Sequence, residues 1–210
     1  MSSNRRNKAS IECVLGASGS GKTSYVMQEL RRKKPKRLLI WDTKGEFARE
    51  KYAAPVASLV DLVAQVSAAG KAGSFALAFK ASGDGKQMRA QFDLLCKVAF
   101  AAKSLTLVAE ELADVTTASH AVEGWRKVSS QGRTEGVSIY GLSQHPASID
   151  KHFFGNASTV RSGRLNFESH VKAVANVMGV SADEVRAMLP LQWIQKDMNS
   201  GALSRGKITF

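Results

Sequence analysis

Residues 16 to 23 read Gly16-Ala17-Ser18-Gly19-Ser20-Gly21-Lys22-Thr23 and fit the phosphate-binding pattern G-x-x-x-x-G-K-[ST] at every required position. Glycines there let the backbone turn tightly, so that several N–H groups point at one polyphosphate. In such loops the lysine reaches the β- and γ-phosphates, and the hydroxyl after it binds Mg²⁺. The expected nucleotide-binding residues are Gly16, Ala17, Ser18, Gly19, Ser20, Gly21, Lys22, Thr23 and Ser24.

The sequence on either side of this loop supplies the context that the motif requires. Residues 11–15 have the apolar pattern of a short buried strand, and residues 22–33 have the pattern of a helix with one apolar side. A strand, a glycine-rich loop and a helix in this order place the positive end of the helix dipole at the anion. The alternative, a glycine-rich turn without a ligand, leaves this order unexplained.

Strand and helix patterns alternate along the rest of the chain. Predicted strands cover residues 11–15, 37–41, 74–79, 104–109, 136–142, 157–161, 191–196 and 202–210. Predicted helices cover residues 22–33, 58–69, 86–102, 118–131, 166–178 and 181–189. This alternation predicts an α/β fold of three layers, with a mainly parallel sheet between helices. Asn199-Ser200-Gly201 predicts a closing hairpin, and hence an antiparallel C-terminal edge.

The chain has 210 residues, which suits one domain over residues 11–210 after a basic tail at 1–10. Thirty Lys and Arg against eighteen Asp and Glu give a net charge of +12, which favours a polyanionic partner such as nucleic acid. Neither a signal peptide nor an apolar run long enough for a membrane span is expected, so we expect a cytoplasmic protein. The alternative interpretation is that the charge serves solubility alone.

A run of basic residues follows the first helix at 31–37, and the tail carries Arg5, Arg6 and Lys8. A helix of twelve residues runs about 18 Å from the phosphate loop, so both segments are expected at the opposite edge of the sheet. Either they form a basic patch for a polyanion, or they balance a helix dipole and form a solvated turn. A second basic segment, the loop at 80–86, lies either along a DNA pore or in a plain connector.

Acidic and amide side chains follow two of the predicted strands. Glu110 and Glu111 end the strand at 104–109, where a metal and an attacking water meet in nucleoside triphosphatases. We assign Glu110 to Mg²⁺ together with Thr23, and Glu111 to activation of the water. Gln144 ends a later strand and is placed at the γ-phosphate or the water. The alternatives are a charged turn for the acids and a loop amide for Gln144.

Arginine neutralises the charge that develops during phosphoryl transfer, in cis or from a neighbouring subunit. Arg133 is the first candidate for this role. Arg126, Arg161 and Arg164 compete with it, and a solvated or DNA-facing arginine is an equal alternative.

The order of three further segments resembles that of the HerA/FtsK-type ATPases. Residues 39–47 (Leu-Ile-Trp-Asp-Thr-Lys-Gly-Glu-Phe) look like the family's strand followed by Asp, Lys-Gly-Glu and an aromatic residue. Residues 132–146 resemble its arginine, strand and Gln-x-Pro segment, and residues 158–165 resemble the strand that follows. In its small size, the chain is most similar to the genome-packaging ATPases of tailless, membrane-containing icosahedral phages. A glutamate at 110, where the family usually has Asp, departs from the pattern.

This resemblance implies a P-loop ATP hydrolase of the additional-strand class, in which one more strand separates the two Walker strands. It implies ATP and Mg²⁺ as cofactors and a homo-oligomeric ring, with a hexamer favoured. It implies sequence-independent movement of double-stranded DNA and contact with capsid or packaging-vertex proteins, in the host cytoplasm and at the virion vertex. By position, Glu110 and Glu111 take the Walker B places, Gln144 the sensor place and Arg133 that of a trans-acting finger.

Three other functions are compatible with the phosphate loop. A phage-assembly or secretion ATPase that moves protein or single-stranded DNA is expected to carry a membrane anchor. A small-molecule kinase is expected to carry an acceptor pocket and a lid with clustered arginines. Glu111 and Gln144 favour hydrolysis of water over transfer to a bound acceptor. A non-catalytic, nucleotide-gated scaffold stays open as the third alternative.

Overall fold

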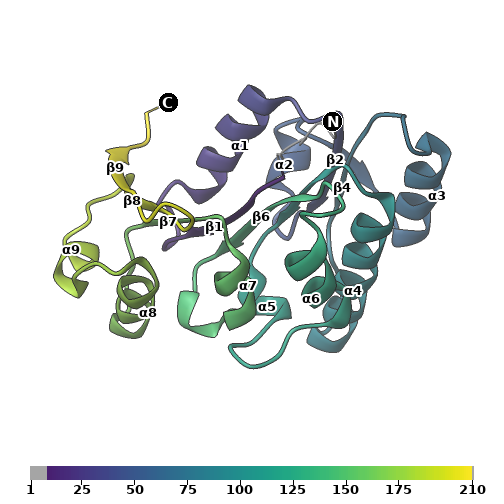
Figure 1. The fold of residues 1–210 in the computed structure, drawn as a ribbon. Helices are drawn as coiled ribbons and strands as arrows, with labels where there is room; N and C mark the ends of the chain where they lie inside the picture. Colours follow the sequence, from purple (N-terminus) through teal and green to yellow (C-terminus); the bar gives the residue numbers. More distant parts are fainter. Residues whose placement is uncertain (1–8, 210) are drawn as a thin grey trace, which may run out of the picture.

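The computed structural model describes residues 9–209. They form three layers, with a nine-stranded sheet between two layers of helices (Figure 1). The strands are β1 (Ile11–Leu15), β2 (Arg37–Trp41), β3 (Ala54–Val56), β4 (Phe75–Phe79), β5 (Thr106–Ala109), β6 (Ser138–Ser143), β7 (Thr159–Gly163), β8 (Gln192–Asp197) and β9 (Leu203–Lys207). Their order is β3-β4-β2-β5-β6-β1-β7-β8-β9. All pairs up to β7 are parallel, and the pairs β7–β8 and β8–β9 are antiparallel. The predicted fold class is confirmed.

Helices cover both faces of the sheet. Their bounds are α1 (Lys22–Lys33), α2 (Glu46–Arg49), α3 (Leu59–Ala69), α4 (Gly85–Ala102), α5 (Leu112–Val115), α6 (Glu123–Gln131), α7 (Lys151–Asn156), α8 (Glu168–Met178) and α9 (Ala182–Arg186), with a 3-10 turn at Pro146–Ser148. α1 and α2 lie on one face, and α3 to α9 pack on the other (Figure 1). The sheet therefore separates two apolar cores of unequal size.

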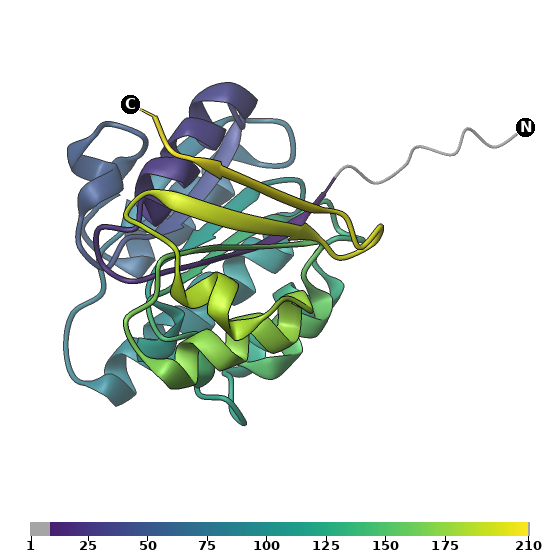
Figure 2. The same cartoon turned by 90° about the vertical axis from the view of Figure 1, so that its left-hand side faces the viewer.

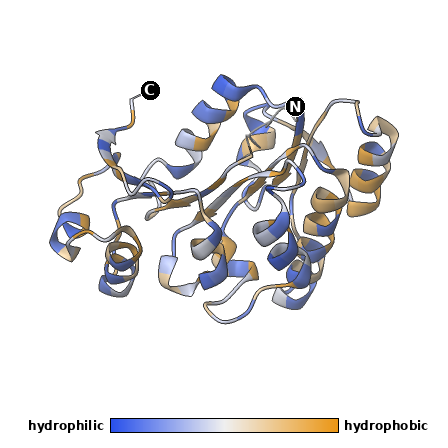
Figure 3. Ribbon diagram, in the orientation of Figure 1, coloured by the Kyte–Doolittle hydropathy of each residue, from blue (hydrophilic) through white to orange (hydrophobic). Residues whose placement is uncertain are grey.

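Alternating side chains of the central strands fill these two cores. On β2, Leu39 and Trp41 face the larger core under α4, whereas Leu38 and Ile40 face the smaller core under α1. This explains why the strand reads as a continuous apolar run, since strands covered on both faces have no solvated side. Hydrophobic residues accordingly follow the sheet and the inner sides of α3 and α4 (Figure 3).

The strand between β1 and β5 decides where the functional side chains meet. β6 pairs in parallel with both neighbours, so Val14 lies beside Leu142, and Val108 lies beside Tyr140. β6 is thus the additional strand that the resemblance implies between the two Walker strands. The carboxyl ends of β5, β6 and β1 meet side by side, and ligands bind parallel α/β sheets at this edge.

The structure corrects several predicted boundaries. The helix expected over 118–131 begins at Glu123, because the turn before it is closed by a bridge between Thr117 and His120. The strand β3 and the helices α2, α5 and α7 were not predicted, since elements of three to six residues show no periodicity. Among the described residues, no helix combines the length and apolar character needed to cross a bilayer. The predicted basic tail falls largely on residues 1–8, outside the described range.

Candidate nucleotide-hydrolysis site

The phosphate loop connects the buried strand β1 to the first turn of α1, as the sequence predicts. Gly21 ends the loop with φ 90° and ψ 13°, a left-handed conformation that favours glycine. Gly16 has φ 145°, and a Cβ there would lie 2.4 Å from the Ser20 hydroxyl. Backbone hydrogen bonds fix the loop to the ends of two strands, from Gly16 N–H to Ser143 (3.3 Å) and from Ala17 N–H to Arg164 (2.7 Å). The loop is thus held by both neighbours of β1.

Lys22 points into the concave side of the loop. Its Nζ donates to the carbonyl oxygens of Gly16 (2.7 Å) and Ala17 (3.2 Å). Burial lowers the pKa of Lys22 to about 8, although the carboxylates of Glu111 and Glu110 favour its charged form. A polyphosphate offers this ammonium a stronger partner than two neutral carbonyls do.

Glu110 lies beyond the end of β5 and is only 3% exposed. Its two carboxylate oxygens accept long hydrogen bonds from the hydroxyls of Thr23 (3.5 Å) and Thr43 (3.4 Å). Burial, together with the nearby charges of Asp42 and Glu46, raises the pKa of Glu110 to about 7. A carboxylate in this position gains most from a bound cation.

Glu111 differs from its neighbour in conformation and in charge. Its φ of 44° and ψ of 55° are left-handed, which strains a residue with a Cβ and is typical of functional sites. Its Oε1 accepts hydrogen bonds from Gln144 Nε2 and from Lys44 Nζ (3.1 Å). Burial alone would raise the pKa of Glu111, but these hydrogen bonds and the charge of Lys22 bring it below its usual value. Glu111 is therefore an ionised, oriented carboxylate, as a general base must be.

A cavity of about 240 Å³ collects these groups. It is lined by Ser18, Gly19, Ser20, Gly21, Lys22, Thr23, Ser24, Lys44, Glu46, Glu110, Glu111 and Leu142. Gln144 joins them through its hydrogen bond to Glu111. A larger groove of about 530 Å³ lies between α6 and α7, but it holds none of the predicted site residues except Arg126. The structure thus brings together the loop, both glutamates and the glutamine from three separate segments.

The residues present fit Mg²⁺ bound together with phosphates. Thr23 and Glu110 offer oxygen ligands, which Mg²⁺ prefers, and the long hydrogen bond between them leaves the carboxylate poorly satisfied. Among residues 9–209 there is no cluster of three or more His, Cys, Asp or Glu that could hold a metal alone. Mg²⁺ commonly completes its shell with waters and nucleotide phosphates, so two protein ligands suffice here.

Three site residues come from the segment after β2, to which the sequence had assigned no physical role. Thr43 contacts Glu110, Lys44 contacts Glu111, and Glu46 lines the cavity. Asp42 is structural instead, since its buried carboxylate accepts the N–H of Ala48 (3.0 Å). The sequence does carry a signal for these residues, which is a run of charged residues directly after a buried strand. They reach the site because β2 is parallel to β5 and ends at the same edge of the sheet.

The four candidate arginines lie in very different places. Arg133 donates to Ser158 Oγ (3.3 Å), which also binds the first N–H of β1, so it lies at the opposite edge of the sheet from the cavity. Arg161 is 8% exposed and stacks between the rings of Tyr25 and Trp193, which makes it structural. Arg126 lines the groove beside α6. Arg164 is the candidate nearest the phosphate loop.

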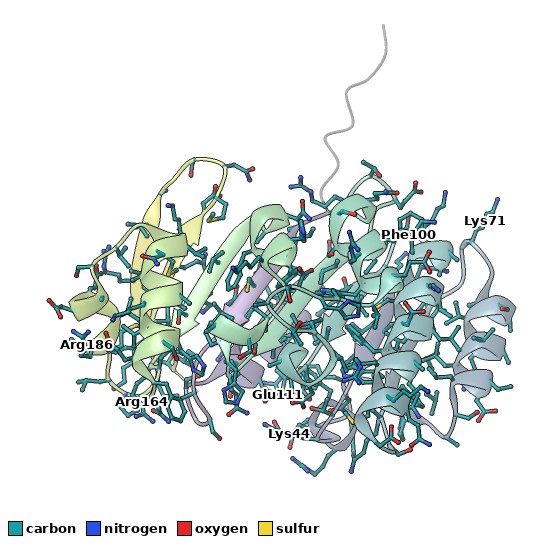
Figure 4. All side chains as sticks on the ribbon, turned by 90° about the horizontal axis from the view of Figure 1, so that it is seen from below. Lys44, Lys71, Phe100, Glu111, Arg164 and Arg186 are labelled. Atoms are coloured by element: carbon teal, nitrogen blue, oxygen red, sulfur yellow. The ribbon has the colours of Figure 1, made fainter. Side chains whose placement is uncertain are left out.

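The labelled side chains in Figure 4 show the two edges of the molecule. Lys44, Glu111 and Arg164 lie along one edge, whereas Lys71 and Phe100 lie away from it. This agrees with the backbone contact between Arg164 and the phosphate loop. The catalytic candidates and Arg164 therefore share the carboxyl edge.

Comparison with known proteins agrees with this arrangement, although no protein-family model matches the chain. The sequence is similar to Protein P9 of Pseudoalteromonas phage PM2, with 27% identity over 203 residues that cover 94% of this chain and 88% of P9.

Two solved structures share the fold over nearly all of their length. The genome packaging NTPase B204 of Sulfolobus turreted icosahedral virus 2, in complex with AMPPCP, superimposes with a TM-score of 0.70 at 15% identity, covering 95% of this chain and 97% of B204. VirB4 of Thermoanaerobacter pseudethanolicus gives a TM-score of 0.72 at 12% identity, covering 100% of this chain and 91% of VirB4. The chain has a P-loop NTPase fold, and the predicted resemblance to genome-packaging ATPases is confirmed.

Proposed function

We propose that this protein is an ATP hydrolase that moves double-stranded DNA, and that it packages a viral genome into a preformed capsid. The observation that carries the hydrolase is the placement of Glu111. It is ionised, fixed by Gln144 and Lys44, and lines the same cavity as the phosphate loop. A phosphate cradle alone needs no such group, whereas hydrolysis needs a base that positions water.

The residues divide the chemical work as follows. Backbone N–H groups of the loop and the ammonium of Lys22 bind the ATP phosphates. Glu111 accepts a proton as the water oxygen attacks the γ-phosphorus, Gln144 holds that carboxylate in place, and the bond to the β-γ bridging oxygen breaks to release ADP. Thr23 and Glu110 would hold Mg²⁺, which would neutralise charge on the phosphates.

Two observations support DNA as the substrate: the positive net charge of the chain and its similarity to known viral proteins. The net charge is +12, and the chain is similar to Protein P9 of a phage and to a genome packaging NTPase. Lys80, Lys86 and Arg89 are exposed at the carboxyl edge and make no ion pair with other residues in the range 9–209. Lysines and arginines of this kind bind the DNA backbone without reading its sequence.

We further propose a homo-oligomeric ring, with six subunits favoured, that docks on capsid or packaging-vertex proteins. Arg133 lies away from its own cavity, so any role in catalysis requires a neighbouring subunit's nucleotide. Arg164 is the alternative, because it lies beside the phosphate loop. The protein would be located in the host cytoplasm and, during packaging, at the virion vertex.

The translocation of DNA is tested by displacement of a third strand from a triplex placed along a duplex. The wild-type protein with Mg²⁺ and ATP is expected to displace the third strand, and the E111Q variant is expected to bind DNA without displacing it. Hydrolysis of ATP without displacement would contradict the motor. Displacement that is equal in both proteins would contradict the role of Glu111.

A further inference from the structure

The C-terminal end of the described chain packs against the phosphate loop. Gly21 is the turning point before α1, and a Cβ built on it would lie 2.3 Å from Ile208 Cδ1 and 3.3 Å from Leu191 Cδ2. Residues almost 190 positions apart are therefore in van der Waals contact. No hydrogen bond joins Ile208 to the loop among the described residues, so this contact acts through shape and packing.

Ile208 is held firmly in this place. It is 6% exposed, and its N–H donates to the carbonyl oxygen of Leu191 (2.9 Å). The carbonyl oxygen of the next residue, Thr209, accepts a hydrogen bond from Gln28 on α1 (2.8 Å). Leu191 itself has φ 65°, a left-handed backbone that a branched side chain adopts only when its surroundings impose it.

A second contact anchors the same hairpin to α1 at Tyr25, one turn after Gly21. The Arg161 guanidinium lies 3.9 Å from the centre of the Tyr25 ring and 3.7 Å from that of Trp193 on β8. It also donates to Gln195 (3.0 Å). Figure 2 shows β8 and β9 side by side, running past α1 toward the C-terminus. The hairpin thus meets α1 at its first turn and again one turn further along.

We infer that the β8–β9 hairpin and the segment after it position the phosphate loop, with Ile208 and Leu191 as the positioning residues at Gly21. This rests on the proposed function only in that the loop binds ATP. Packing on Gly21 fixes the direction of the N–H groups that follow it, and those groups must converge on the phosphates. Loss of the packing lets the loop move, so affinity falls while the catalytic groups on β5 and β6 stay in place.

The direct test compares two buried isoleucines, one in the β8–β9 hairpin and one in the segment after it. I208A removes the contact with Gly21, I208V removes only the Cδ1 atom and keeps Cγ1, and I194A removes a side chain that is 2% exposed in the core on the other face. We expect I208A to raise the Kd for ATP and the KM about tenfold, with kcat within about twofold, and I208V to lie between I208A and the wild type. I194A should lower the melting temperature without this change in Kd. Equal losses of affinity in I208A and I194A would overturn the inference.

A double-mutant cycle tests the contact itself. G21A places a methyl against Ile208 Cδ1, and I208V deletes that atom while the backbone strain at residue 21 stays the same. The affinity loss caused by G21A should therefore be several-fold smaller in the I208V background. Losses that multiply independently would contradict the contact.

Hydrogen exchange on the nucleotide-free protein separates this inference from the proposed function. In I208A, the amides of residues 17–24 should exchange about tenfold faster than in the wild type and in I194A. Unchanged exchange would overturn the positioning role. If exchange responds but the wild type binds no ATP, the proposed function fails and the positioning of the loop stands.

Discussion

The two edges of the sheet both carry many charged residues but use them in opposite ways. At the carboxyl edge, Lys22, Glu110 and Glu111 face one cavity, and each has a pKa shifted from its ordinary value. At the amino edge, the basic run 31–37 is largely occupied by contacts within the protein. Perturbed groups that converge on a cavity mark a functional site, whereas paired groups on a surface do not.

The contacts of the basic run show this in detail. Arg32 pairs with Glu29 (2.7 Å), Lys33 pairs with the buried Glu12 (2.9 Å), and Arg31 stacks on Tyr52. Within the run, Arg31, Lys34 and Lys36 are exposed and make no ion pair with other described residues, and of these three only Arg31 stacks on a ring. A run of like charges in a sequence is therefore a poor guide to a polyanion-binding patch, because the fold decides which charges are already paired.

The largest expected effect is at the carboxyl edge. E111Q keeps the size of the side chain and one acceptor oxygen but removes the base, so phosphate release should fall roughly 10³-fold. ATP binding, measured by calorimetry, should stay within about twofold. The control is D114N, a nearby carboxylate on α5 that does not line the cavity. Turnover retained in E111Q would reduce Glu111 to the residue that begins α5.

The next effect concerns stability at the opposite edge. Arg37 is 6% exposed, and its guanidinium donates to the carbonyl oxygens of Gly70, Gly73 and Ala102. R37M leaves these carbonyls unpaired, so the free energy of unfolding should fall by about 3 kcal/mol in urea titrations. At urea concentrations too low to unfold the protein, the affinity of R37M for ATP should equal that of the wild type. A lower ATP affinity with normal stability would mean that the edges are not separate.

Removal of the Lys22 ammonium should weaken ATP binding roughly 100-fold, because it deletes charge-assisted hydrogen bonds to the phosphates. K34A is the matched control, since it changes a lysine beyond the other end of the same helix. Calorimetry with ATP and Mg²⁺ measures both variants. Normal affinity in K22A would refute the assignment of the phosphate loop.

Measurements of DNA affinity compare the basic side chains at the two edges of the sheet directly. Neutralisation of Lys80, Lys86 and Arg89 to glutamine should weaken binding to duplex DNA roughly 30-fold at low salt and reduce the salt slope by about 3. Neutralisation of Arg31, Arg32 and Lys33 should have a smaller effect, because these side chains are engaged elsewhere. Fluorescence anisotropy across a salt series measures both. A larger loss from the amino-edge variant would reverse the comparison.

The smallest expected effect is on pH. Mg²⁺ competes with a proton for Glu110, whose pKa is raised to about 7, so Mg·ATP affinity should fall about tenfold for each unit of pH below that value. Lys22 loses its charge as the pH rises through about 8, which weakens affinity again. The result is an optimum between these values. E110Q should lose the acidic limb and keep the alkaline one, and an unchanged acidic limb would contradict the assignment of Glu110.

Much of the fold and the core of the site could be predicted from the sequence. The phosphate loop has an autonomous signature, and Glu110, Glu111 and Gln144 follow strands whose carboxyl ends must share one edge of a parallel sheet. The roles of Thr43 and Lys44 depended on β2 lying beside β5, which is a matter of strand order rather than of local pattern. The contact of Ile208 with Gly21 depended on the path of the last strand, and no local pattern reports that.

The central claim is that the carboxyl edge hydrolyses ATP in response to DNA. The most direct test measures phosphate release from Mg·ATP with and without long duplex DNA. The account predicts slow release by the wild-type protein alone, a clear increase with duplex DNA, and none in E111Q. A kinase would show transfer to an added acceptor instead, and an assembly ATPase would show no response to duplex DNA. Absence of phosphate release under both conditions would contradict the account.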